Sequence, residues 1–132
     1  MAVYIDTSAF FKLVRDERHS RALHAWLRNE SPTLVGSELL RIEGIRVTRR
    51  ISPTLLAEAR SRLSAIPQLR VTSDTWMRAA ELEPAGLRSL DALHMALALT
   101  MNEDLEAMLT YDERLTEACA HHGIRVIAPK DA

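Results

Sequence analysis

Short runs of apolar residues alternate with longer amphipathic stretches along the whole of this 132-residue chain. Five runs are expected to form buried strands: residues 3–5, 33–36, 69–71, 107–110 and 124–127. Strands that alternate with helices usually form a parallel sheet that helices cover on both faces. The pattern therefore predicts an α/β fold. No linker, repeat or low-complexity segment interrupts it, so we expect a single domain over residues 1–132.

The stretches between these runs carry helical signals at their ends. The expected helices cover about residues 7–14, 19–29, 38–51, 53–66, 74–83, 89–101 and 112–120. Pro53 suits the first position of a helix, and Gly123 suits the position after a helix end. Trp26 and Trp76 lie on apolar helical stripes and are expected in the core. Gly44 inside a helix costs about 1 kcal/mol against alanine, so we expect it to allow a close approach.

Four acidic residues stand where the chain leaves a strand or enters a helix: Asp6, Glu43, Asp91 and Asp112. Ligands of parallel sheets bind beyond the carboxyl ends of the strands, and Asp6 and Asp112 follow predicted strands. Carboxylates that are brought together repel one another unless a divalent cation lies between them. Oxygen ligands suit Mg²⁺ or Mn²⁺. A metal-activated water at such a site would serve phosphoryl transfer.

Each acid also has an ordinary structural role that the sequence leaves open. Asp6 and Asp112 would be good helix N-caps, Glu43 would suit a solvated helix face, and Asp91 could interact with a helix dipole. The apolar neighbours of Asp91 nevertheless make an unpaired charge costly. His94, one turn after Asp91, is expected to support the site rather than to bind a metal.

Charge and cysteine content limit the remaining possibilities. Residues 41–62 carry a net charge of +4, against −5 for the rest of the chain. Fifteen of the 17 basic residues are arginine, whose planar group fits phosphate. Cys119 is the only cysteine, which fits a reducing cytoplasm and excludes a disulfide within one chain. No signal peptide is visible, and no apolar stretch approaches the ~20 residues of a membrane span.

Each acid belongs to a short motif: Tyr4 to Ala9, Ser37 to Glu43, Leu87 to His94 and Leu109 to Leu115. In these four motifs the chain resembles the PIN-domain ribonucleases, and within them the VapC-type toxins of bacterial toxin–antitoxin pairs. The motifs occur in the family's order and at similar separations. The resemblance covers essentially the full length, and Leu87 to His94 is its most specific segment.

The resemblance implies a three-layer α/β/α sandwich with a five-stranded parallel sheet. It implies Mg²⁺- or Mn²⁺-dependent cleavage of RNA, in which the catalytic acids Asp6, Glu43, Asp91 and Asp112 bind the metal directly or through water. Ser8 would support that site. Relatives of this kind usually form homodimers, and a VapB-type antitoxin silences them; it would lie near the helices of residues 38–66.

Several arginines are candidates for phosphate contacts with an RNA backbone. They are Arg15, Arg18, Arg41, Arg46, Arg49, Arg50 and Arg88. For any single one of them, a solvated face or a salt bridge within a dimer is the safer interpretation.

Two other functions remain to be weighed. A catalytically silent PIN-like module would bind RNA or protein without cleaving it, and the complete set of four acids argues against that. A phosphate-accepting receiver domain has a similar length and fold. It needs a second acid directly after Asp6, where this chain has Thr7, and an acceptor at the end of strand three, where Asp74 lies too far along; only Lys130 supports it.

Overall fold

The computed structural model describes residues 2–132. Its elements follow the alternation of strands and helices that the sequence predicts. In chain order they are β1 (Ala2–Ile5), α1 (Thr7–Val14), α2 (Ser20–Glu30), β2 (Thr33–Ser37), α3 (Glu38–Ile51), the 3₁₀ turn η1 (Pro53–Leu55), α4 (Leu56–Ser64), β3 (Gln68–Leu69), α5 (Ser73–Glu81), α6 (Ser89–Leu99), the 3₁₀ turn η2 (Asn102–Asp104), β4 (Leu105–Leu109), α7 (Glu113–His121) and β5 (Val126–Ile127).

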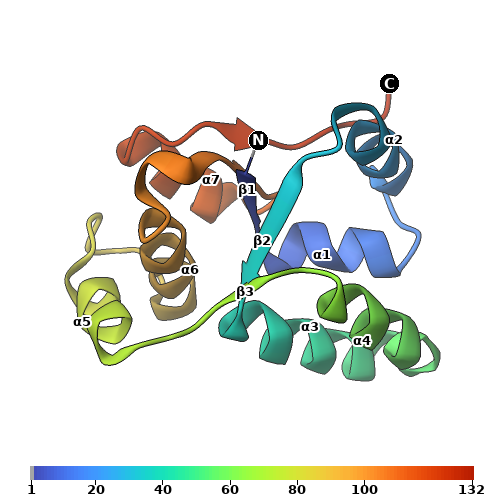
Figure 1. Ribbon diagram of the computed structural model, residues 1–132, viewed down its shortest axis with the longest axis horizontal. Helices are drawn as coiled ribbons and strands as arrows, with labels where there is room; N and C mark the ends of the chain where they lie inside the picture. Colours follow the sequence, from blue (N-terminus) through green and yellow to red (C-terminus); the bar gives the residue numbers. More distant parts are fainter. Residues whose placement is uncertain (1) are drawn as a thin grey trace.

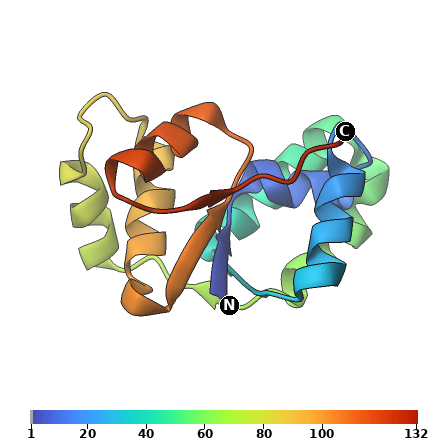
Figure 2. The ribbon, with the colours of Figure 1, turned by 90° about the horizontal axis from the view of Figure 1, so that it is seen from above.

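The five strands form one sheet in the order β3-β2-β1-β4-β5, and every neighbouring pair is parallel. β1 lies at the centre, where Val3 is in register with Leu34 of β2 and Ala107 of β4. Helices α1 to α4 lie on one side of the sheet, and α5 to α7 lie on the other (Figures 1 and 2). The predicted α/β fold with a five-stranded parallel sheet is confirmed.

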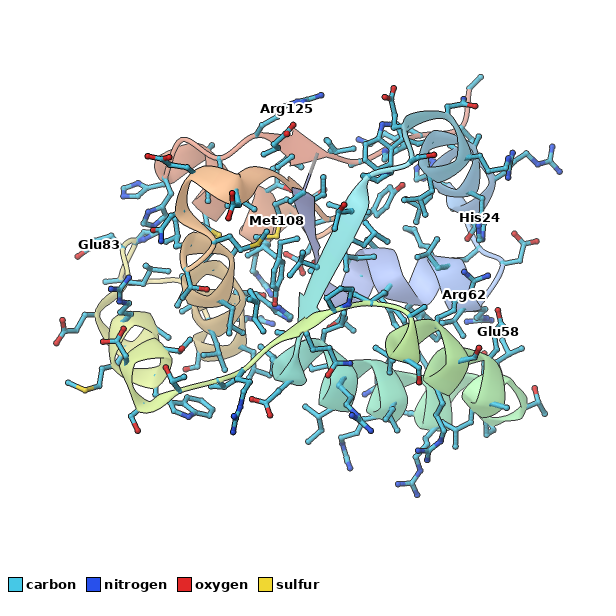
Figure 3. All side chains as sticks on the ribbon, viewed as in Figure 1. His24, Glu58, Arg62, Glu83, Met108 and Arg125 are labelled. Atoms are coloured by element: carbon cyan, nitrogen blue, oxygen red, sulfur yellow. The ribbon has the colours of Figure 1, made fainter. Side chains whose placement is uncertain are left out.

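Successive residues of β1 supply the cores of both layers, because side chains alternate across a strand. Val3 and Ile5 pack into the cluster that includes Phe10, and Tyr4 points into the second cluster with Met108. Figure 3 shows Met108 between the sheet and α6. All three β1 side chains are fully buried. A central strand that is buried on both faces explains why its sequence is a continuous apolar run rather than an alternating one.

Side-chain caps begin several helices. The carboxylate of Asp6 accepts a hydrogen bond from the backbone N–H of Ala9, and Ser37 accepts one from that of Leu40. Asp112 caps α7 in the same way. The cap of α5 is Thr72, not Ser73 or Asp74 as the sequence would allow, because Thr72 and Thr75 form a reciprocal capping box.

Three elements differ in detail from the prediction. Pro53 begins a 3₁₀ turn before α4 rather than the α-helix itself. The edge strand β3 is only Gln68–Leu69, because it pairs with just the last two residues of β2. β5 starts at Val126 instead of residue 124, since the N–H of Ile124 bonds to the carbonyl of Cys119 and closes α7. Gly123 has a φ of 69° at this closure, as the sequence predicted.

The two tryptophans have different fates. Trp26 packs against the core beside α1, whereas the side chain of Trp76 is 57% exposed, so its predicted burial is wrong. The apolar spacing of α5 does not distinguish a buried stripe from an exposed apolar surface. Gly44 does allow a close approach: a Cβ atom there would lie 2.9 Å from Cε2 of the buried Phe10. This contact brings α1 and α3 together beneath Asp6 and Glu43.

The last residues of the chain contact α2, on the side of the sheet that carries α1 to α4. The carboxylate of Asp131 accepts hydrogen bonds from the backbone N–H groups of His19 and Ala22 at the start of α2, at 2.9 and 3.2 Å. The residue that would normally cap α2, His19, makes no side-chain cap bond. Asp131 therefore supplies the missing cap from a distant part of the sequence. None of the helices within residues 2–132 combines the length and the apolar character required to cross a bilayer.

Candidate active site

The four predicted acids belong to segments that follow β1, β2 and β4 or that begin α6. Asp6 comes directly after β1, and Asp112 lies just past β4. Glu43 is in the second turn of α3, which follows β2 without a loop, and Asp91 is in the first turn of α6. Because all the strands are parallel, the carboxyl ends of β1, β2 and β4 meet at one edge of the sheet.

Asp6 is almost fully buried, and hydroxyl groups surround it. Thr110 donates to Oδ2 at 2.6 Å, and Ser8 lies 2.8 and 3.0 Å from the two carboxylate oxygens. The backbone N–H of Ala9 donates to Oδ1 at 3.0 Å. Burial raises the pKa of Asp6 even though these donors act in the opposite direction. The neutral donors thus orient the carboxylate without supplying the positive charge that its burial calls for.

Glu43 is held by two donors on one oxygen. The hydroxyl of Thr7 and the imidazole Nε2 of His94 each lie 2.6 Å from Oε1. Burial tends to raise the pKa of Glu43, but the hydrogen bond and charge of His94, with the bond from Thr7, hold that pKa below its ordinary value. Glu43 is therefore a carboxylate near neutral pH, and it does not lie on the freely solvated helix face that its spacing allowed.

The charge of Asp112 acts on Asp91. Burial raises the pKa of Asp91 first, and the charges of Asp112 and then Glu43 raise it further. Asp112 Oδ1 accepts from the N–H of Leu115 at 3.0 Å, so Asp112 is a helix cap as well. Its own backbone N–H donates to the hydroxyl of Thr110, the same group that donates to Asp6. One threonine thus joins two of the acids.

The oxygens left available by these bonds suit a divalent cation. The hydrogen bonds described for Glu43 and Asp112 end on Oε1 and Oδ1, which leaves Oε2 and Oδ2 for a ligand. Within residues 2–132, no three Asp, Glu, His or Cys side chains are already gathered closely enough to hold a metal. Separation is expected of carboxylates that repel one another, since the charges of Asp112 and Glu43 raise the pKa of Asp91. Hard oxygen donors suit a divalent cation such as Mg²⁺.

Hydroxyl and aromatic groups around the acids were not singled out from the sequence. Thr7 and Thr110 each donate to an acid, and Tyr4 bonds to His94 behind Glu43. The only sequence signal is their adjacency, since Thr7 follows Asp6 and Thr110 comes two residues before Asp112. The predicted supporting residue Ser8 does lie against Asp6, and its hydroxyl also accepts the N–H of Tyr111 at 2.9 Å.

The predicted RNA-binding arginines do not gather in one place. Arg46, Arg49 and Arg50 line a hollow of about 320 Å³ on α3. Arg41 lies in two neighbouring hollows, and Arg18 lines another beside Thr110. Arg15 and Arg88 are exposed, the first at the end of α1 and the second just before α6.

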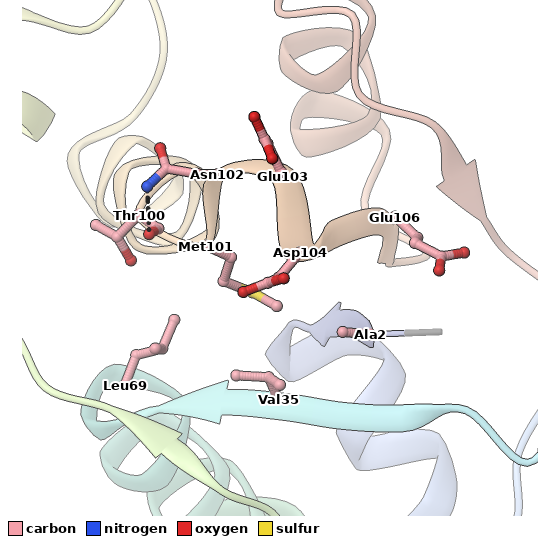
Figure 4. A pocket seen from close by; sticks show the side chains of 9 residues that line it. All are labelled: Ala2, Val35, Leu69, Thr100, Met101, Asn102, Glu103, Asp104 and Glu106. Carbon is pink, nitrogen blue, oxygen red and sulfur yellow. Dashed lines mark hydrogen bonds between the residues drawn. The ribbon is translucent and has the colours of Figure 1, made fainter.

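A large hollow also lies beside the amino ends of β1 and β4. It has a volume of about 1410 Å³, and Figure 4 shows Ala2, Val35 and Leu69 on one side of it with residues 100–104 and 106 opposite. Ala2 is the first residue of β1, Val35 is in the middle of β2 and Leu69 ends β3. The hollow therefore extends obliquely across these strands, and none of the four acids is among its lining residues.

The raised pKa of Asp91 predicts how acid affects the metal-free protein. A carboxyl group whose pKa is higher in the folded than in the unfolded protein stabilises the folded state while the pH is below its ordinary pKa, about 3.9. This contribution is lost as the pH rises through the raised pKa. Asp91→Asn should therefore have the higher melting temperature near neutral pH, and its advantage should shrink towards pH ~4. Thermal unfolding of both proteins in EDTA tests this. An advantage that grows on acidification would contradict it.

Comparisons with known proteins identify the family. The model for "PIN domain" matches residues 3–121. Ribonuclease VapC46 of Mycobacterium tuberculosis is 38% identical over 128 residues, which cover 97% of this chain and 98% of that protein. Ribonuclease VapC47 of the same species is 36% identical over 131 residues, with 96% of each chain covered. Ribonucleases of this family generally depend on a divalent metal.

Solved structures share the fold at lower identity. A toxin–antitoxin complex from Klebsiella pneumoniae has a TM-score of 0.73 at 20% identity and covers 98% of this chain and 99% of its own. VapC20 of Mycobacterium tuberculosis, described as a sarcin–ricin loop cleaving toxin, has a TM-score of 0.71 at 18% identity, covering 88% and 94%. With a family model over most of the chain and relatives that align along nearly all of it, this protein belongs to the PIN-domain family, and within it to the VapC-type ribonuclease toxins.

Proposed function

We propose that this VapC-type protein is an endoribonuclease that hydrolyses RNA phosphodiester bonds at the edge of the sheet where its four acids lie. The observation that carries the proposal is the arrangement of Asp6, Glu43, Asp91 and Asp112. Burial raises the pKa of Asp6, and burial with the charges of Asp112 and Glu43 raises that of Asp91. Glu43 and Asp112 each keep one carboxylate oxygen outside the hydrogen bonds given above. A bound cation would stabilise such a site, because its positive charge offsets the burial and the repulsion of the carboxylates.

Mg²⁺ or Mn²⁺ would be held by the carboxylates of these four residues, and it would activate a water and offset charge on the phosphate. The protein groups do the positioning. Thr110 and Ser8 fix both oxygens of Asp6, and Thr7 and His94 fix one oxygen of Glu43. A carboxylate of the four that is not bound to the metal could accept a proton from the attacking water. Asp91 is the candidate, because its pKa is raised and, unlike Asp6, it does not accept the hydrogen bonds of a helix cap and two hydroxyls.

The RNA backbone is expected to follow α3. Arg46 and Arg50 come one and two turns after Glu43, so they share its side of the helix. With Arg49 they line one hollow, which suits the phosphates beside the scissile bond. Arg62 is a poor candidate because it bonds to Glu58 at 2.8 Å and lies beside His24 (Figure 3).

A VapB-type antitoxin is the expected protein partner. The exposed side chain of Ile42 and the neighbouring Ile45 line a hollow of about 400 Å³ with Arg41, Arg46 and Gln68. Glu38 also lines it, so an apolar floor is bordered by two arginines and one acid, which suits an amphipathic segment. This hollow lies within residues 38–68, close to the region implied by the family resemblance.

We also propose a homodimer in the cytoplasm. Trp76 and Met77 on α5 are 57% and 66% exposed, and Leu90 at the start of the adjoining α6 is 51% exposed. Large apolar side chains that gather on a surface commonly mark an interface. The VapC-type resemblance implies a second copy of the chain as a partner, and we propose this face for it.

Removal of the metal is the direct test of the activity. Purified, antitoxin-free protein should cut total bacterial RNA into discrete products with Mg²⁺ or Mn²⁺ and should leave it intact in EDTA. Readdition of the metal should restore cleavage, because the carboxylates themselves are unchanged. Binding of RNA without cleavage under every metal condition would instead favour the catalytically silent module. Cleavage that persists in EDTA would contradict the proposed mechanism.

A further inference from the structure

A buried chain of hydrogen bonds extends from the core of the sheet to Glu43. The hydroxyl of Tyr4 lies 2.8 Å from Oγ of Ser37 and 2.7 Å from Nδ1 of His94. Nε2 of the same imidazole lies 2.6 Å from Oε1 of Glu43. Tyr4 and Ser37 are fully buried, and His94 is 3% exposed. Three polar side chains are therefore buried beside the apolar cluster around Met108, and their hydrogen bonds end on one of the acids.

The proton positions follow from what each atom is able to donate. Glu43 is ionised and can only accept, so Nε2 of His94 must carry a proton. The N–H of Leu40 donates to Ser37 Oγ at 3.1 Å, which leaves the serine hydroxyl proton for Tyr4. Tyr4 in turn donates to Nδ1 when the imidazole is neutral. Each hydrogen bond is then donated in the same direction, from Ser37 to Tyr4, from Tyr4 to His94 and from His94 to Glu43.

We propose that Tyr4 is a positioning residue for metal binding, and that it acts through His94 to hold Glu43 with Oε2 turned towards the cation. This inference rests on the proposed metal-dependent function. The bond from Tyr4 fixes both the orientation of the imidazole and the nitrogen that carries its proton. With Thr7 and His94 on the same oxygen, the carboxylate has one orientation in which both donors are satisfied. Groups that orient a ligand in this way typically change metal affinity 10–100-fold when they are removed.

A role in packing alone would not require this arrangement. Tyr4 shares its cluster with Met108, Leu93 and other apolar side chains, where phenylalanine would fill the same volume. The tyrosine hydroxyl and the imidazole are polar, so burying them requires hydrogen-bond partners that a phenylalanine would not need. Tyr4 therefore adds stability through its ring, and its hydroxyl adds the link to His94. The two contributions can be separated by removing the hydroxyl alone.

The test compares the two tyrosines of the chain. Tyr4→Phe removes the hydroxyl that meets His94, whereas Tyr111→Phe removes one that donates to the carbonyl of Pro129 at 2.6 Å, away from this chain of bonds. Mn²⁺ binding to each metal-free protein is measured by electron paramagnetic resonance, alongside thermal unfolding. Tyr4→Phe should weaken Mn²⁺ binding about 10–100-fold, and Tyr111→Phe should leave it unchanged. Cleavage by Tyr4→Phe should recover as the Mn²⁺ concentration rises.

The outcomes separate this inference from the proposed function. A wild-type protein that neither binds Mn²⁺ nor cleaves RNA would contradict the function itself. Wild-type Mn²⁺ affinity in a folded Tyr4→Phe protein, while the wild type binds and cleaves, would overturn only the role of Tyr4. Nitrogen NMR of wild-type His94 gives a readout that does not depend on the variant folding. A proton on Nε2 with none on Nδ1 supports the inference, and a proton on Nδ1 would overturn it.

Discussion

Asp91→Asn is expected to reduce RNA cleavage at least about a hundredfold, beyond the usual upper range for residues that only support a metal ligand. No side-chain hydrogen bond to Asp91 is described, so the amide should leave the surrounding bonds intact. The substitution removes the negative charge of a carboxyl group whose pKa is raised by burial and by the charges of Asp112 and Glu43. Initial cleavage rates at saturating Mg²⁺, with Mn²⁺ affinity measured in parallel, test the expectation.

The matched control is Asp74→Asn. Asp74 is also in the first turn of a helix, but its side chain is 73% exposed and pairs with Arg78 on the surface of α5. The same chemical change there should leave both cleavage and Mn²⁺ affinity at wild-type values. If Asp91→Asn cleaved as fast as this control, Asp91 would have only the helix-dipole role that its position also permits.

The fold was predictable because the strands of this chain are short, apolar and separated by helices with clear ends. Val3 to Ile5 is a continuous apolar run, and it forms the central strand, buried on both faces. Gly123 ended α7 as predicted, since its positive φ favours glycine. The edge strands and the burial of Trp76 were predicted less well. β3 is shorter than predicted because strand length at a sheet edge depends on the neighbouring strand, which local sequence does not describe.

The candidate site was predictable only in part. Asp6 and Asp112 could be placed from sequence because each follows an apolar strand. Neither their contact through Thr110 nor the bond of His94 to Glu43 is visible in spacing, since Glu43 and His94 are 51 residues apart. Tyr4 was predicted as a buried strand residue, and its hydroxyl became informative only when the imidazole was placed beside it.

Two substitutions of Asp6 are expected to separate its role as a helix cap from its role as a metal ligand. Asp6→Ala should unfold more easily by about 2–4 kcal/mol, because it removes a helix cap and leaves buried donors without an acceptor. Those donors are the N–H of Ala9 and the hydroxyls of Ser8 and Thr110. Asp6→Asn keeps an oxygen for the cap, and the hydroxyls can rotate to accept its amide. It also removes a charge whose burial raises the pKa of Asp6, which acts in the stabilising direction near neutral pH, so the net loss should stay below about 1 kcal/mol.

Cleavage should respond differently from stability. Both Asp6 variants should lose at least about a hundredfold in rate, since neither amide nor methyl replaces a charged metal ligand. Thr72→Ala, which removes the cap of α5 at a distance from the acids, should lose about 1 kcal/mol and cleave normally. Urea unfolding of the metal-free proteins and RNA cleavage with Mg²⁺ give both quantities. A stable Asp6→Asn protein with full activity would show that Asp6 is a helix cap and nothing more, and the metal site would then have to be assigned to the other three acids.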